Sequence, residues 1–213
     1  MNYQVFCVNP VQENCYIVWD EVSGEAAIID CGAWTSSEKA AISLFVSDKH
    51  LKLKYALPTH THFDHVVGLP FVSETYAIHP YCHRDDATTY ASVPEMLWQW
   101  FHIKPDSPLP QMSYYDQCGT LSIGTHQIHV IQTPGHSPGS VCLHIPSLKL
   151  LFSGDTLFNM SIGRTDLPGG SYQQEIESIH DKLLTLDETT TVLPGHGLKT
   201  TIAREKLTNP YLI

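Results

Sequence analysis

The most concentrated group of chemically active side chains lies in residues 59–68, Thr-His-Thr-His-Phe-Asp-His-Val-Val-Gly, where His60, His62, Asp64 and His65 fall within six residues. In an extended segment the alternating positions 60, 62 and 64 project to one side of the chain, whereas His65 projects elsewhere. Imidazole and carboxylate together suit Zn²⁺, Fe or Mn better than Ca²⁺ or Mg²⁺. The segment therefore predicts a transition-metal site, and its two directions allow one loop to serve two metals.

Three later segments each place one more ligand-type residue directly after a predicted strand. They are Thr133-Pro134-Gly135-His136, Ser153-Gly154-Asp155 and Leu193-Pro194-Gly195-His196. A glycine precedes each ligand and permits the backbone turn that directs the side chain inward. Four separate loops that each deliver His or Asp are hard to explain as an accident, so we expect all seven residues to meet in one site.

Short strands and helices must position these loops. Strands are predicted at 3–8, 15–19, 26–29, 51–57, 121–123, 127–132, 140–145, 149–152 and 190–193, the first three as an antiparallel meander. Thr35-Ser36-Ser37-Glu38 is a capping box, and the helix that it opens should bury Ala41, Leu44 and Phe45. Helices are also expected at 66–76, from a second capping box at 171–174, and from about 199 to 207.

Residues 81–111 allow two interpretations. The segment 91–103 holds three large aromatic residues, Trp98, Trp100 and Phe101, ahead of prolines at 105, 108 and 110. It is either a helix packed on the core or one wall of a substrate cleft, with Trp98 and Trp100 as the contacts. The histidines nearby lack ligand spacing and are expected to be structural.

Composition bounds the class of protein. A chain of 213 residues, 42% hydrophobic and 16% charged, suits one packed domain over 1–213. Its formal charge of −10, without a Lys/Arg-rich run, argues against a nucleic-acid partner. No apolar window reaches membrane-spanning length. The first residues lack a signal-peptide pattern, and the six cysteines, expected to be mostly small buried hydrophobes, contain no C-x-x-C pair. We therefore expect a cytoplasmic protein.

The order of these motifs, HxHxDH followed by His, Asp and His, resembles the metallo-β-lactamase-fold superfamily over nearly the whole chain. The resemblance implies an α+β fold, a four-layer αββα sandwich with a binuclear metal site at one edge. It also implies two divalent metal ions, zinc as the first choice and iron or manganese as alternatives. Carried over residue by residue, the first metal would be held by His60, His62 and His136, the second by Asp64, His65 and His196, with Asp155 bridging.

Residues 154–170, which include Ser161-Ile162-Gly163-Arg164-Thr165-Asp166, resemble the short glyoxalase II-like, or hydroxyacylglutathione hydrolase-like, proteins. This resemblance implies a thioesterase that cleaves a small hydroxyacyl thioester with water activated between the metals, Asp64 and Asp155 taking part. Asp30 would brace the metal loops, although Cys31 stands where such proteins often have proline. We expect Arg164 and Asp166 to fix their loop as a charge pair. Only a short segment follows His196 in this sequence. We therefore expect no counterpart of the C-terminal portion with which full-length glyoxalase II grips glutathione, and the resemblance does not identify the thiol of the substrate.

Other functions are carried as alternatives. A persulfide dioxygenase, with one iron at two His and one Asp, resembles the same pattern. A non-catalytic metal-binding protein would bind metal without turnover. The nuclease branches are disfavoured by the acidic charge, and true β-lactamases by the missing export signal and by the pair Asp64-His65.

Overall fold

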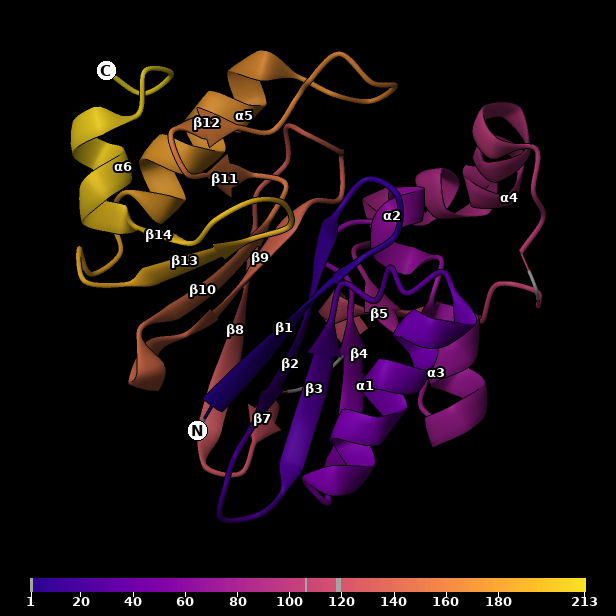
Figure 1. The fold of residues 1–213 in the computed structure, drawn as a ribbon. Helices are drawn as coiled ribbons and strands as arrows, with labels where there is room; N and C mark the ends of the chain where they lie inside the picture. Colours follow the sequence, from indigo (N-terminus) through magenta and orange to yellow (C-terminus); the bar gives the residue numbers. More distant parts are fainter. Residues whose placement is uncertain (1, 106, 118–119) are drawn as a thin grey trace.

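The computed structural model describes residues 2–105, 107–117 and 120–213 (Figure 1). The first sheet has the order β1-β2-β3-β4. Its strands are Asn2–Val8 (β1), Glu13–Trp19 (β2), Glu25–Ile29 (β3) and Lys52–Leu57 (β4). The first three form the expected antiparallel meander, and β4 joins β3 in parallel. Helix α1 (Ser36–Asp48) makes the connection that parallel pairing requires.

The second sheet has the order β14-β13-β10-β9-β8-β7 and repeats this plan. Strands β7 to β10 are antiparallel neighbours, and β13 joins β10 in parallel after α5 (Tyr172–Ser178) and a π-helical turn, Ile179–Leu183. The bounds are Leu121–Ile123 (β7), His126–Gln132 (β8), Val141–Ile145 (β9), Leu150–Gly154 (β10), Thr191–Pro194 (β13) and Thr200–Thr201 (β14).

Three apolar layers hold four structural layers together. Side chains of both sheets, such as Ile29 and Phe152, form the central layer. A second layer lies between the first sheet and the helices α1, α3 (Leu69–Tyr76) and α4 (Ala87–Phe101). The third lies between the second sheet and the helices α5 and α6 (Ile202–Thr208). Figure 1 shows these helices on the two outer faces. The expected α+β sandwich of αββα type is confirmed.

Short elements complete the chain. The two-residue strands Tyr81–Cys82 (β5) and Ser113–Tyr114 (β6) pair in parallel, and Leu157–Phe158 (β11) and Ser161–Ile162 (β12) form a hairpin. The 3₁₀ turns are Arg84–Asp86, Tyr115–Gln117 and Pro146–Leu148. Cys118 lies outside the described residues; of the other cysteines, Cys7 is exposed and the remaining four are buried. No helix in the described ranges combines the length and the hydrophobicity that crossing a membrane requires.

Several sequence-based bounds were wrong for local reasons. The helix expected at 66–76 is two helices, α2 (Phe63–Val66) and α3. They separate at Gly68, whose N–H donates to the Cys31 carbonyl at 2.9 Å, and a Cβ there would lie 2.7 Å from that oxygen. Helix α1 has its expected capping box but buries Ile42 and Val46, while Leu44 is 70% exposed. Helix α4 begins at residue 87 rather than 91, and α6 begins at 202, after β14, rather than near 199.

Candidate metal centre

Four loops deliver the seven predicted residues to the edge at which the two sheets meet. Strand β4 leads into residues 60–65, β8 into His136, β10 into Asp155 and β13 into His196. The first loop belongs to one sheet and the other three belong to the second sheet. Potential ligand atoms of the seven fall into overlapping groups in which all atoms lie within 4.8 Å of one another. The structure thus brings together every residue that the motifs singled out.

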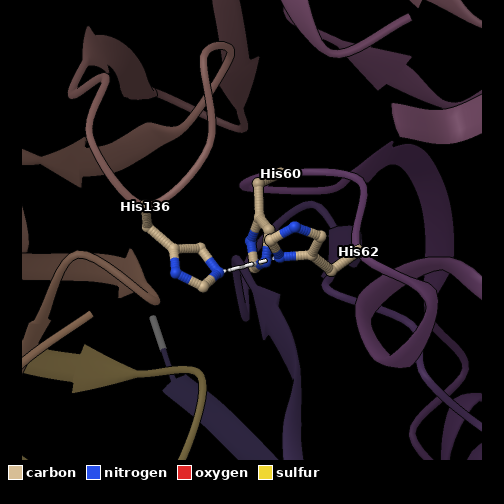
Figure 2. A group of neighbouring side chains, drawn as sticks. All are labelled: His60, His62 and His136. Atoms are coloured by element: carbon tan, nitrogen blue, oxygen red, sulfur yellow. Dashed lines mark hydrogen bonds between the residues drawn. The ribbon is translucent and has the colours of Figure 1, made fainter. Parts of the chain in front are cut away.

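The first group consists of His60, His62 and His136, whose rings turn toward one another from two loops (Figure 2). His62 Nδ1 lies 2.8 Å, and His60 Nε2 3.2 Å, from His136 Nε2. These separations are close to the edge of about 3.3 Å of a tetrahedron with metal–nitrogen bonds of about 2.0 Å. Burial and the neighbouring imidazoles lower the pKa of His60 well below its usual value and that of His62 to about 4. The rings of His60 and His62 are therefore neutral, the form that binds metals.

The second group consists of Asp64, His65 and His196. His196 Nε2 lies 3.2 Å from Asp64 Oδ2, and His65 Nε2 lies 3.7 Å from the same oxygen. His65 is fully buried, whereas the His196 side chain is 28% exposed. Together these residues offer two nitrogens and one carboxylate, and His196 is the member nearest to solvent.

Asp155 lies between the two groups. Its Oδ2 is 3.6 Å from Nε2 of His136, in the first group, and 3.6 Å from Nε2 of His196, in the second. Its Oδ1 lies 3.4 Å from His65 Nε2. Although burial opposes the charge, His65 and the other two histidines hold the pKa of Asp155 well below its usual value. The carboxylate is thus anionic and faces both groups, as a bridging ligand must.

Unpaired buried atoms test whether the residues fit the metals that the resemblance implies. Asp155 Oδ1 and His65 Nε2, which lie 3.4 Å apart, are buried and make no hydrogen bond among the described residues. Buried polar atoms are rarely left unpaired because desolvation is costly. A donor set of imidazole nitrogens and carboxylate oxygens that lack partners fits divalent transition metals.

Asp30 braces the first loop as expected. It adopts a φ of +51° at the end of β3. Its Oδ1 accepts from the Thr59 N–H at 2.6 Å, its Oδ2 accepts from Thr59 Oγ1 at 2.9 Å, and Oδ2 also lies 3.3 Å from His65 Nδ1. Contact at Nδ1 leaves Nε2 of His65 to face the second group, because a second partner of a ligand ring fixes its tautomer.

Arg164 and Asp166 form the expected pair, with Nε and Nη2 each 2.8 Å from a carboxylate oxygen. Both side chains are more than half exposed. The Arg164 contact with a predicted ligand comes from its backbone, because the carbonyl lies 2.7 Å from His136 Nδ1 and accepts its proton. That bond leaves His136 Nε2 free for the first group.

Three buried or half-buried polar residues that hold the loops were missed by the sequence analysis. Glu175 accepts from the His136 N–H at 2.8 Å, and burial raises its pKa to about 8. Asn9 Nδ2 donates to the Asp64 carbonyl at 3.0 Å. Asp86 accepts from the Thr61 N–H at 2.8 Å. Each partner is a backbone group 25 to 55 residues away, and such contacts carry no motif.

A cleft of about 1110 Å³ opens over the ligand groups. One wall is a face of α4, and the other is the β11–β12 hairpin with the loop that follows it; they contribute Thr88, Ser92, Met96, Trp100, Phe158, Ile162, Arg164 and Leu167. Trp100 lines this cleft, as the wall interpretation expects. For Trp98 that interpretation was wrong. Position 98 is about 200° from Met96 around a helix, and its ring packs against His102 and lies 5.9 Å from Lys104 Nζ.

Comparisons with known proteins agree on the family. The profile described as the Metallo-beta-lactamase superfamily matches residues 8–196. "Probable metallo-hydrolase YqgX" of Bacillus subtilis (strain 168) is 35% identical over 212 residues and is aligned over 98% of its length, with 100% of this chain. "Hydroxyacylglutathione hydrolase GloC" of Haemophilus influenzae (strain ATCC 51907 / DSM 11121 / KW20 / Rd) is 33% identical, with the same coverages.

Solved structures give the same result. The crystal structure of BLEG-1 B3 metallo-beta-lactamase has a TM-score of 0.89 and 35% identity, covering 99% of each chain. TTHA1623 in a di-iron-bound form has a TM-score of 0.82 and 32% identity, covering 98% of this chain and 100% of its own. With the profile match and the αββα fold, these findings lead to one conclusion: the chain belongs to the metallo-β-lactamase superfamily of metal-binding hydrolases.

Proposed function

We propose that this protein is a binuclear metal-dependent hydrolase that cleaves thioesters, with a hydroxyacyl thioester as the substrate class. The observation that carries the proposal is the position of Asp155. One of its oxygens lies 3.6 Å from a nitrogen of each ligand group, in the floor of an open cleft. A shared carboxylate is typical of a site built for two metals that act together.

The seven residues of the two groups would divide between two metals. His60, His62 and His136 would hold the first metal, Asp64, His65 and His196 would hold the second, and Asp155 would serve both. When bound, two such ions supply a water of lowered pKa and the polarisation of a carbonyl oxygen. Asp64 and Asp155 provide the negative charge that two divalent cations require. Asp30 and the Arg164 carbonyl hold the ring orientations of His65 and His136.

Zinc is our first choice of metal because histidine nitrogens predominate in the donor set. Iron and manganese remain the alternatives, since imidazole and carboxylate also suit them. The relative TTHA1623 was solved in a di-iron-bound form, which supports keeping iron as an alternative.

The cleft supports a small-molecule substrate. Its volume of about 1110 Å³ is large enough for an acyl group and part of its thiol carrier. The apolar side chains of Trp100, Phe158 and Ile162 line the approach to the ligand groups. A departing thiolate, from a thiol of pKa about 8.5, needs little help from a separate general acid. The GloC relative, 33% identical, supports the choice of thioester.

Hydrolysis of β-lactams is a second candidate, favoured by one observation. A solved structure at 35% identity carries the name B3 metallo-beta-lactamase. In both reactions water attacks an activated acyl carbon. The test therefore compares thioesters and β-lactams directly.

The test combines metal analysis with a substrate panel. Protein purified without chelator should contain about two metals per chain and should hydrolyse hydroxyacyl thioesters with a higher kcat/KM than β-lactams. The panel should contain thioesters of glutathione and of at least one unrelated thiol, because the proposal does not specify which thiol carries the acyl group. One iron per chain with oxygen uptake on a persulfide would support the dioxygenase instead. Two metals without turnover of any panel member would support a metal-binding protein.

A further inference from the structure

Asp86 is a fully buried carboxylate that belongs to neither ligand group. It ends a 3₁₀ turn and is the residue directly before α4. Its side chain does not cap that helix. Burying a carboxylate is costly unless it is paired or hydrogen-bonded, so the partners of Asp86 indicate what it stabilises.

Those partners belong to two metal loops. Oδ2 accepts from the Thr61 N–H at 2.8 Å, from Thr61 Oγ1 at 3.3 Å and from Ser137 Oγ at 3.1 Å. Oδ1 accepts from the Gly139 N–H at 2.7 Å. Thr61 stands between His60 and His62, while Ser137 directly follows the third histidine of the first group.

The fit is specific to a carboxylate in this place. Each of these side-chain contacts brings a donor, and an ionised carboxylate accepts at both oxygens. Gly139 is required for the approach, because a Cβ at that position would lie 2.7 Å from Asp86 Oδ1 and from its backbone nitrogen. An asparagine at position 86 would place its NH₂ group, a donor, against the N–H of either Thr61 or Gly139, so that one of these hydrogen bonds would be lost.

We propose that Asp86 is a positioning residue that sets the separation of the two loops that form the first metal group. It fixes the backbone on both sides of the gap across which His62 and His136 meet at 2.8 Å. Because it lies at the start of α4, it also ties the cleft wall to the first group. Asp86 makes none of these hydrogen bonds to Asp64, His65 or His196. The geometry of the second group should therefore depend less on Asp86.

The test is a Co²⁺ titration in competition with a coloured chelator, made on Asp86→Asn. His62→Ala and His196→Ala identify the binding phases of the first and second groups. We expect Asp86→Asn to weaken the first phase by about tenfold, the lower end of the effect of outer partners of metal ligands, and to leave the second phase within about twofold. The inference rests on the proposed metal centre; if neither histidine variant changed its phase, the centre itself would fail.

Glu205→Gln is the matched control for the loss of a buried carboxylate. Glu205 is fully buried and accepts from the Met160 N–H at 2.9 Å and from Asn209 Nδ2 at 2.8 Å, in contacts with the hairpin and α6. It should lower the melting temperature without changing either Co²⁺ phase. If Asp86→Asn behaves in the same way, the positioning role is overturned.

Ser137→Ala keeps the inference testable if Asp86→Asn does not fold. This change removes one hydroxyl donor from Asp86 and should weaken the first phase in the same direction by a smaller factor. If Asp86→Asn does not fold and Ser137→Ala binds Co²⁺ in both phases with unchanged affinity, the proposal is contradicted.

Discussion

At the scale of single residues, Asp155 distinguishes a binuclear site from two separate ones. Its two oxygens face histidines of both groups, so its loss should disturb both metals at once. We predict that Asp155→Asn lowers the metal content from about two per chain and lowers kcat by more than about 100-fold, beyond the range for outer partners. Metal analysis and steady-state kinetics on the same preparation measure the two effects.

Arg164→Ala is the control for this prediction. The Arg164 contact with His136 is a backbone carbonyl, which survives the change, and the lost ion pair is exposed. Exposed pairs contribute little to stability, so the variant should keep its full metal content. Full activity and two metals in Asp155→Asn would show that the bridge is misassigned.

The meeting of these seven residues in one site could be predicted from the sequence, because each has its own local signal. A glycine and a strand end accompany His136, Asp155 and His196 within a few residues. The residues that hold these loops could not be predicted in the same way. Asp86 and Glu175 bind backbone N–H groups far away in the chain, and a backbone N–H has no residue identity that a pattern could reveal.

At the scale of elements, α4 shows how far helical periodicity goes. The segment 91–103 predicted both a helix and a cleft wall, and these were treated as alternatives. The structure combines them, since α4 buries Val93 and Leu97 on one side and lines the cleft on another. The start of the helix at Ala87 was not predicted because Thr88 and Thr89, in its first turn, have only weak helix propensity.

The two tryptophans of α4 give a matched pair for substrate selection. Trp100 lines the cleft and packs on Phe63 at a centroid distance of 5.5 Å, whereas Trp98 does not line it. Trp100 is 53% exposed and Trp98 is 52% exposed, so replacing either one with alanine removes a similar amount of buried side-chain surface. We predict that Trp100→Ala changes kcat/KM unequally among thioesters, because only wall contacts discriminate between substrates.

Trp98→Ala should leave the ratios of kcat/KM among the same thioesters within about twofold. Metal content should be unchanged in both variants. Equal effects of the two changes on every substrate would mean that neither ring contacts the substrate, and the wall assignment for Trp100 would be withdrawn.

At the scale of the whole molecule, the predicted metals would bind across the junction of the two halves. Each group takes two ligands from residues 60–65 and one histidine from the second sheet. Bound ions therefore stabilise the association of the halves as well as the loops. We predict that chelation lowers the melting temperature by about 10 °C, since ligand at a thousand times its dissociation constant adds about 4 kcal/mol and each kcal/mol shifts a domain of this size by about 2–4 °C.

Differential scanning calorimetry before chelation, after chelation and after return of zinc measures this shift. The same treatment of Asp155→Asn should give a smaller shift, because that protein is expected to hold less metal. A melting temperature that does not respond to chelation would argue that metals contribute nothing to the association of the halves.

The division of the ligands between the halves also determines when metal can be captured during synthesis. The first 65 residues carry two ligands for each group, but neither group has its third until His136 and His196 follow. Strand β13, which delivers His196, pairs in parallel with β10, and such non-local pairing forms late in folding. A nascent chain therefore holds only incomplete sites. The choice of ion then falls to the metal supply that the finished chain meets, since the divalent metals that suit these ligands compete by availability as much as by affinity.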